Sequence, residues 1–213
     1  MTDGCWLIAG LGNPPAEYAG TRHNIGAELV EQLAADTGSA LARNRRAGCR
    51  TAEVRIAGAP VVLAVPESFM NVSGGPVQRA AGWYRVPIER IVVCHDDLDL
   101  PLGELRLKRG GGHGGHNGLK DLDRAFGGPG YLRVRIGVGR PPGSTVAADH
   151  VLRPFAAEER DAVATVLATA ADAVAALIAD GLETAQNRFH GRRASGAGPG
   201  ADPGDAVRHE EDR

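Results

Sequence analysis

Four short segments hold the residues best suited to chemistry. GLGNP with TRHN contains Asn13 and His23, SFMNVSG contains Asn71, HDDLDLPLG contains Asp96, and GGGHGGHNGLKD contains Asn117. A neutral imidazole can take a proton from water at cellular pH, because its ordinary pKa lies near 6.5. A carboxylate can orient such a ring, and amides can hold an uncharged polar group and a water in place, since they donate and accept without charge. These residue types predict a hydrolytic centre.

Each segment also has a simpler interpretation. GLGNPP begins like a dinucleotide-binding glycine fingerprint, but it lacks the final glycine and the immediate helix. GGGHGGHNGLK lacks the Lys-Ser or Lys-Thr pair of a P-loop, so its glycines indicate a tight turn or close approach of the backbone to a ligand. An isolated histidine is usually a core or surface residue, and asparagines often bond their own backbone in turns. Only the combination favours catalysis.

A metal site and a serine nucleophile are the chemical alternatives. Imidazole and carboxylate suit several divalent ions, and the candidate ligands are His95, Asp96, Asp97, Asp99, His113 and His116. We expect no metal, because the chain has neither an HExxH pattern nor a cysteine cluster. Ser68 and Ser73 flank the FMN motif, but neither lies in a G-x-S-x-G elbow, which disfavours a serine nucleophile.

Strands and helices alternate around these segments. Apolar patterns predict strands at residues 5–10, 51–58, 60–65, 90–100, 104–109 and 131–139. Helical spacing is found at residues 25–36, 76–86, 117–126 and 158–181. This order predicts an α/β protein, a single-domain α/β/α sandwich with a mixed, largely parallel central sheet. Ligands of such sheets bind at strand ends, which is where the four segments fall.

Composition limits the class of protein. A chain of 213 residues with 43% hydrophobic and 4% aromatic residues suits one aliphatic core. The net charge is −2, yet residues 1–154 hold 18 Lys and Arg against 15 Asp and Glu, a mildly basic balance that permits phosphate contacts. The three cysteines are odd in number and lie in or beside predicted strands, which indicates reduced structural thiols.

The ends of the chain suggest a simple organisation. No apolar run approaches the roughly 20 residues that span a bilayer, and the start lacks a signal-peptide pattern, so we expect a cytoplasmic protein without a membrane partner. Residues 191–213 are rich in Gly, Pro, Ser and charge, which predicts a disordered tail after a catalytic domain at 1–190. Residues 140–151 are predicted to form a mobile lid.

Taken together, the segments resemble the bacterial-type peptidyl-tRNA hydrolase family, from about Trp6 to about His190. GLGNPxxEYxxTRHNxG, SFMNxSG, HDDLDLPxGxxRLKxGGGHGGHNGLKD, RxRIGxGRP and GLETAQNRFH follow the family pattern in order and spacing. The resemblance implies hydrolysis of the ester between peptide and tRNA in peptidyl-tRNA released prematurely from ribosomes, which recycles the tRNA. The implied partner is peptidyl-tRNA, held by its acceptor stem and terminal adenosine. We expect no cofactor and a monomer.

The resemblance also implies roles for individual residues. His23 would be the general base, supported by Asp96, while Asn71 and Asn117 would bind the substrate near the water and carbonyl. Asn13 would read the first amide of the peptide, which separates peptidyl-tRNA from aminoacyl-tRNA.

Aromatic and basic residues would bind the tRNA. Tyr18 and Phe69 fit positions that line the substrate channel, where an aromatic face can stack on adenine, although ordinary packing is the alternative. Contacts to acceptor-stem phosphates would come from a basic group around the glycine-rich loop: Arg106, Lys108, Arg109 and Lys120. A second basic run, on a face that the sequence does not identify, comprises Arg43, Arg45, Arg46 and Arg50.

A non-catalytic RNA-binding protein on the same scaffold is the alternative function. The presence of His23, Asp96 and the three asparagines favours the enzyme, because a pure binder would not need a set of residues that activates water.

Overall fold

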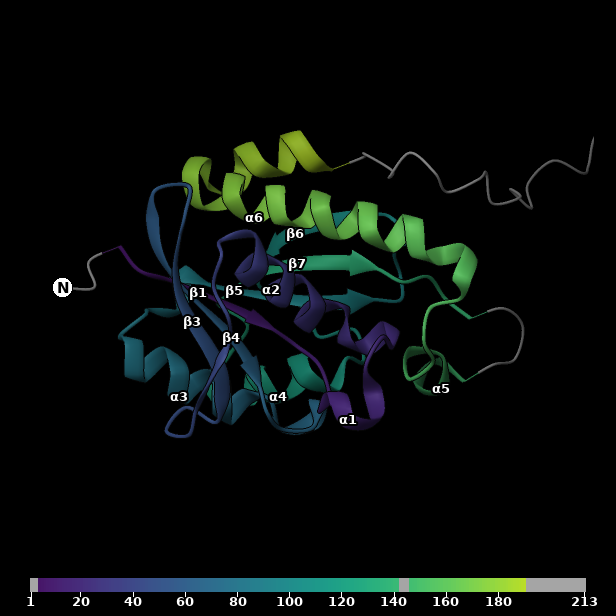
Figure 1. The fold of residues 1–213 in the computed structure, drawn as a ribbon, viewed down its shortest axis with the longest axis horizontal. Coiled ribbons are helices and arrows are strands. Elements are labelled where there is room, and N and C mark those ends of the chain that lie inside the picture. Colours follow the sequence, from purple (N-terminus) through teal and green to yellow (C-terminus); the bar gives the residue numbers. More distant parts are fainter. Residues whose placement is uncertain (1–3, 142–145, 191–213) are drawn as a thin grey trace, which may run out of the picture.

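One mixed sheet organises the protein, for which a computed structural model describes residues 4–141 and 146–190 (Figure 1). Its seven strands run in the order β2-β3-β4-β1-β5-β7-β6. Their bounds are β1 Trp6–Gly10, β2 Ala42–Asn44, β3 Cys49–Ile56, β4 Ala59–Pro66, β5 Ile91–Asp97, β6 Leu105–Arg109 and β7 Leu132–Gly137. The four central strands β4, β1, β5 and β7 are parallel, and the three outer pairings are antiparallel. The predicted mixed α/β sheet is confirmed, with its parallel part at the centre.

Helices cover both faces of this sheet (Figure 1). The longer ones are α2 Ile25–Asp36, α3 Gly74–Tyr84, α4 Asn117–Phe126 and α6 Arg160–Phe189, and the short ones are α1 Pro15–Tyr18 and α5 Ala147–Val151. Buried side chains of α2 and α6 share one apolar cluster with alternate strand residues, and those of α3 and α4 share a second. The predicted three-layer sandwich is therefore confirmed.

Sequence patterns explain the central elements. Parallel strands are buried on both faces, so they read as continuous apolar runs, and β1 and β5 do so at WLIAG and IVVC. In α4, the buried Leu119 and Leu122 lie three residues apart on the core face, and Gly127 ends the helix in the left-handed region with φ 73°.

Several elements differ from the sequence prediction. The helix predicted to end at Gly181 continues to Phe189: Gly181 has φ 82° and kinks it, but Ala185 and Phe189 beyond the kink are buried. Strand β2 was not predicted, because ARN has no apolar alternation and forms only by pairing with β3. The predicted lid contains α5, whereas residues 142–145 and the tail at 191–213 lie outside the described residues. The domain boundary at 190 stays a prediction.

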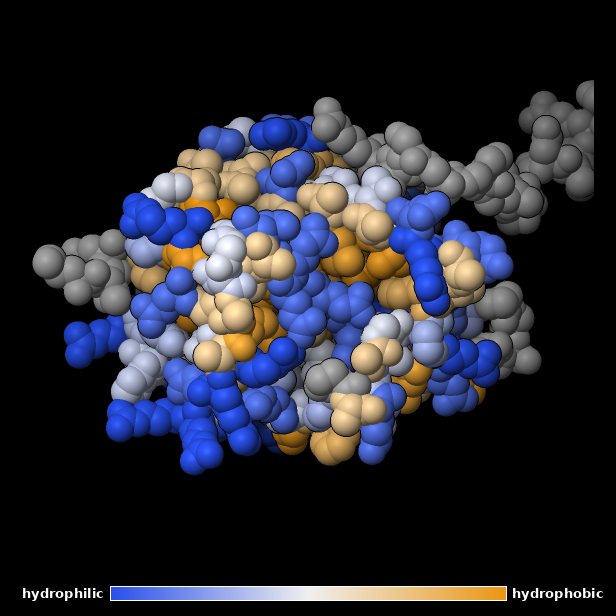
Figure 2. Space-filling model, viewed as in Figure 1, coloured by the Kyte–Doolittle hydropathy of each residue, from blue (hydrophilic) through white to orange (hydrophobic). Residues whose placement is uncertain are grey.

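One helix reaches membrane-spanning length. The stretch Ala157–Phe189 is long and apolar enough to cross a membrane, judged by length and composition alone. This corrects the expectation that the chain has no apolar run of membrane-spanning length. Such a helix is weak evidence for a membrane span, since the core helices of soluble proteins pass the same test. Ten residues of α6 are buried, and the helix packs along the sheet beside α2. In Figure 2 its outer surface carries hydrophilic side chains among hydrophobic ones.

Candidate active site

A close approach of α2 to the sheet brings His23 to Asp96. His23 lies in the short 3-10 helix Arg22–Asn24, which leads directly into α2, and Asp96 lies near the end of β5. A Cβ atom on Gly26 would lie 2.2 Å from the carbonyl oxygen of Cys94, so only glycine allows this packing. The catalytic candidates from two distant segments therefore meet because the backbones touch.

The predicted hydrogen bond between His23 and Asp96 is present. His23 Nδ1 lies 2.8 Å from Asp96 Oδ1, and both residues are buried, at 9% and 3% exposure. Because the carboxylate can only accept, Nδ1 carries the proton in the neutral ring and Nε2 keeps a lone pair. Nε2 has no hydrogen-bond partner among residues 4–141 and 146–190, and the ring lines a cavity. This geometry suits a general base.

Asp96 is surrounded by imidazoles. Its Oδ1 also lies 3.0 Å from Nε2 of His116, and the rings of His23 and His116 are 4.8 Å apart. Burial alone would raise the pKa of the Asp96 carboxyl, but the contacts with His116 and His23 outweigh it and hold that pKa well below its usual range. Burial lowers the pKa of the neighbouring His95 to about 3. The centre thus combines an ionised carboxylate with a neutral His95.

Asn13 is held in a defined orientation. Its backbone N–H donates to Asn24 Oδ1 at 2.8 Å, and Asn24 Nδ2 donates back to the Asn13 carbonyl at 3.0 Å. The Asn13 side-chain Oδ1 accepts from the backbone N–H of Met70 at 2.9 Å. This leaves Nδ2 of Asn13 as a donor. Asn24 was not singled out from the sequence, although it closes the TRHN motif.

The predicted substrate residues gather around one cavity of about 880 Å³. Its lining includes the five hydrolytic candidates and both aromatic residues: Asn13, His23, Asn71, Asp96, Asn117, Tyr18 and Phe69. The rings of Tyr18 and Phe69 meet edge to face at 6.5 Å, and Phe69 is 54% exposed, so it is not ordinary core packing. Helix α5 of the predicted lid forms another part of the wall.

The basic residues divide between two locations. In the pairing of β6 with β7, Arg106 stands opposite Arg135 and Lys108 opposite Arg133. Lys108 and the two β7 arginines line the cavity, although the sequence had indicated only Lys108. Arg109 instead donates to the carbonyl oxygens of Gly130 and Glu89, outside the cavity lining. Lys120 is exposed on α4 and also lies outside that lining.

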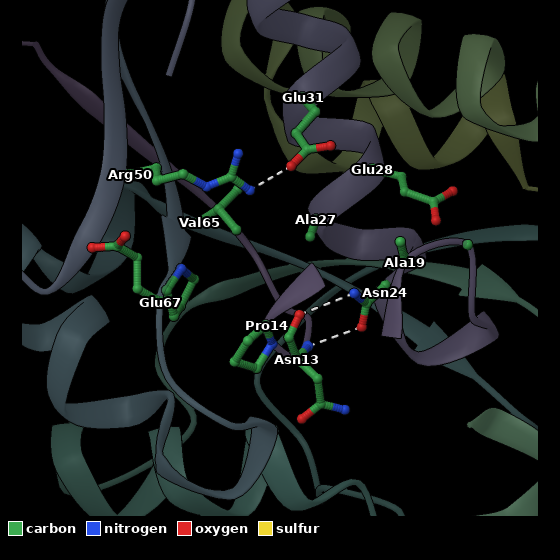
Figure 3. A pocket seen from close by; sticks show the side chains of 12 residues that line it. Asn13, Pro14, Ala19, Asn24, Ala27, Glu28, Glu31, Arg50, Val65 and Glu67 are labelled. Atoms are coloured by element: carbon green, nitrogen blue, oxygen red, sulfur yellow. Dashed lines mark hydrogen bonds and ion pairs between the residues drawn. The ribbon is translucent and has the colours of Figure 1, made fainter. Parts of the chain in front are cut away.

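The second basic run lies near a smaller pocket. This pocket has a volume of about 300 Å³. Asn13 lines it on its backbone side, and the Asn13 side chain points away from Arg50 and Glu31 (Figure 3). Arg50 pairs with Glu31 in its wall (Figure 3). Arg43 pairs with Glu67 at 3.0 Å and Arg46 stacks 4.7 Å from the ring of Trp83, so much of the run is satisfied within the protein.

The alternative chemistries have little geometric support. Within residues 4–141 and 146–190, the group whose ligand atoms lie close enough to hold a metal is His23, Asp96 and His116, but each ring meets the carboxylate at hydrogen-bond distance, which accounts for their proximity. Ser68 donates to the carbonyl of Val72 and Ser73 to that of Met70, and neither hydroxyl bonds a histidine. Neither Ser68 nor Ser73 therefore has a histidine base in the part of the chain that the structure describes.

Comparisons with known proteins identify the family of this chain. The family model for peptidyl-tRNA hydrolase matches residues 7–196. The chain belongs to the peptidyl-tRNA hydrolase family. A peptidyl-tRNA hydrolase of Frankia casuarinae is 56% identical over 188 residues, covering 88% of this chain and 95% of its own. That of Kineococcus radiotolerans is 50% identical over 197 residues, covering 89% and 98%.

Solved structures show the same fold. A crystal structure of peptidyl-tRNA hydrolase from Acinetobacter baumannii superposes with a TM-score of 0.84 at 36% identity, covering 92% of this chain and 99% of that one. The family and the α/β fold expected from the sequence are confirmed. The roles of single residues are not tested by these similarities.

Proposed function

We propose that this protein hydrolyses the ester between peptide and tRNA in peptidyl-tRNA, with His23 as the general base. The observation that carries the proposal is the 2.8 Å contact between His23 Nδ1 and Asp96 Oδ1. It leaves Nε2 unprotonated in a cavity that also holds amide donors. This chain covers nearly the whole length of relatives that are named peptidyl-tRNA hydrolases. Neither the contact nor these relatives support the alternative of a non-catalytic RNA-binding protein.

The reaction needs few components because the ester is already activated. Water attacks the carbonyl carbon and gives a proton to Nε2 of His23, while Asp96 stabilises the resulting imidazolium. Amide N–H groups of Asn71 and Asn117, together with Nδ2 of Asn13, are the candidate donors to the developing oxyanion. The bond from carbon to the ribose oxygen then breaks, and His23 returns the proton to that oxygen.

Substrate recognition uses the rest of the cavity. Tyr18 and Phe69 present an aromatic edge and an exposed face on which the terminal adenine can stack. Lys108 lines the cavity as an exposed cation and is a candidate for acceptor-stem phosphates. Arg106 lies on the same strand and face but outside the cavity lining, and it pairs with Glu104 at 3.7 Å. Arg109 remains a weaker candidate, because carbonyl oxygens engage its guanidinium. The proposal places a monomeric enzyme in the cytoplasm.

The test of catalysis is His23→Ala. Hydrolysis of N-acetylated aminoacyl-tRNA should fall by about 10²–10⁴-fold, the usual contribution of a general base, while tRNA affinity changes little. Ser68→Ala is the matched control and should keep full activity, and a chelator should change nothing. Near-normal turnover by His23→Ala would refute the mechanism, and activity lost to a chelator and restored by added metal would revive a metal site.

The test of tRNA binding is Lys108→Ala. Affinity should fall equally for different tRNAs, and the slope of log affinity against log salt should decrease by about 1, as expected for one lost phosphate contact. Arg55→Ala, an exposed site on β3 outside the cavity lining, is the control. An unchanged slope for Lys108→Ala would remove this residue from the interface.

A further inference from the structure

One carboxylate oxygen serves two histidines. Asp96 Oδ1 accepts from Nδ1 of His23 at 2.8 Å and from Nε2 of His116 at 3.0 Å. The side chains of His116 and Asp96 are 8% and 3% exposed, so water competes little for these bonds. Two donors on one oxygen must share its electron density. The strength of one bond therefore depends on the other.

The tautomer of His116 is fixed by the helix that follows it. His116 is the N-cap of α4, and its Nδ1 accepts from the backbone N–H groups of Gly118 at 3.1 Å and Leu119 at 3.3 Å. A proton on Nδ1 would face two N–H donors and the positive end of the helix dipole. The neutral ring thus carries its proton on Nε2 and donates it to Asp96.

The other titratable and charged groups near this cluster do not bond the Asp96 carboxylate. His95 packs its ring against His116 at 5.1 Å and donates from Nδ1 to the backbone carbonyl of Asp96. Arg133 donates to the carbonyls of Gly111 and Gly112.

The flanking ion pairs have their own partners as well. On β5 and β7, Asp97 pairs with Arg135 at 2.7 Å. Arg22, next to His23 in the chain, turns to the carbonyl of Pro154 and the carboxylate of Glu159. The imidazole of His116 is therefore the neighbour that competes directly for Asp96 Oδ1.

We propose that His116 is a positioning residue that sets the basicity of His23 through the oxygen they share. Its N–H holds the Asp96 carboxylate in the plane that His23 needs, and it also withdraws electron density from Oδ1. The second effect weakens the stabilisation of the His23 imidazolium. His116 thus keeps His23 in the unprotonated form at lower pH. The link to hydrolysis rests on the proposed function, whereas the link between the two rings does not.

The decisive variant is His116→Asn. Asparagine is a good N-cap, so it keeps α4 and Asn117 in place, but its shorter side chain cannot reach Asp96. The matched control, read by the His23 titration and not by turnover, is His113→Asn: His113 lies in the same loop at the cavity wall, is exposed, and accepts from the backbone N–H of Gly115 instead of donating to Asp96. His116→Ser is a second capping variant should the first fold poorly by circular dichroism.

Two measurements separate tuning from simple structural support. The first follows the titration of the His23 ring by NMR in the full free chain, which needs no activity. In His116→Asn the midpoint should rise by about half a unit, a roughly 3-fold change in the protonation constant. The second is the pH profile of kcat/KM on N-acetylated aminoacyl-tRNA, whose acidic limb should move up equally. The plateau value of kcat/KM should fall by roughly 3- to 10-fold, because the Asp96 carboxylate is held in place less firmly.

Each outcome decides the matter. A higher midpoint in His116→Asn, with His113→Asn matching the unaltered protein, supports the proposal. An unchanged or lower midpoint overturns it, as does a rise in KM with an unmoved acidic limb, which would show that His116 only caps α4. If the unaltered protein fails to hydrolyse the substrate, the proposed function fails, and the NMR titration still decides whether His116 tunes His23.

Discussion

Asp96→Asn tests the central contact by removing charge with almost no change in volume. His23 Nδ1 and Asp96 Oδ1 are 2.8 Å apart. Opposite unit charges centred about 4 Å apart in an effective dielectric of about 20 attract each other by about 4 kcal/mol. One factor of ten corresponds to 1.36 kcal/mol, so kcat should fall by about 10³-fold. The asparagine amide can also turn its N–H toward His23 and favour the wrong tautomer, which adds to the loss.

The assay is single-turnover hydrolysis of N-acetylated aminoacyl-tRNA across pH. Asp96→Asn should lower the plateau and shift the acidic limb to lower pH, because the imidazolium has lost its partner. Adding His23→Ala to Asp96→Asn should cost little beyond His23→Ala alone, since residues that act as a unit are not additive. A variant within threefold of the unaltered rate, or fully multiplicative losses in the double variant, would refute the reasoning.

Further predictions concern packing, pH and substrate choice. Gly26→Ala must move α2 away from the Cys94 carbonyl, so thermal unfolding should show a loss of about 1–3 kcal/mol of folding stability, and activity should fall. Gly82→Ala is the control: a Cβ there has open space, so the change should be neutral or stabilising. Burial lowers the pKa of His95 to about 3 in the folded chain, so the unfolded chain takes up a proton first as the pH falls. The free energy of unfolding should therefore decrease below about pH 6.5. In denaturant titrations, His95→Asn should remove about 2 kcal/mol of the stability that the unaltered protein loses between pH 7 and pH 5. Asn13→Asp replaces the donor Nδ2 by a carboxylate oxygen. This variant should lower kcat/KM for acylated substrate by about 10–100-fold and should lower it less for free aminoacyl-tRNA. An equal loss for both substrates would contradict a role in discrimination.

The fold was largely predictable because its central elements have strong local patterns. Continuous apolar runs predicted β1 and β5, and helical spacing predicted α2 and α4. β2 has no such pattern and exists because β3 offers it a partner. The extension of α6 past Gly181 depends on tertiary contacts: Gln186 donates to the carbonyl of Leu107, and His190 Nε2 accepts from its N–H.

The site was predictable as a set of segments but not as a set of bonds. Parallel strands end at one edge of the sheet, so polar loops after β1 and β5 had to be neighbours. The sequence could not show that His116 caps a helix and donates to Asp96, because this depends on where α4 begins relative to β5. Its position directly before NGLKD was the available signal.

Register and distant contacts decided the remaining roles. The antiparallel pairing places Arg109 opposite Leu132, the first residue of β7, so it points away from the cavity even though it follows Lys108 in the chain. The donor orientation of Asn13 is imposed by the amide of Met70, which is 57 residues away. Such a contact leaves no trace in local spacing.

That orientation alters how recognition of the peptide should be understood. Oδ1 of Asn13 accepts one hydrogen bond from Met70 and keeps a second lone pair for a peptide N–H, while the fixed side chain also presents Nδ2 as a donor. Nδ2 has no hydrogen-bond partner within residues 4–141 and 146–190, and a carbonyl oxygen of the acyl group or of the ester would be a suitable acceptor for it. Acylated substrates carry one more such oxygen than free aminoacyl-tRNA. We propose that a fixed donor facing this added acceptor contributes to discrimination, and the same donor can stabilise negative charge when the carbonyl is attacked.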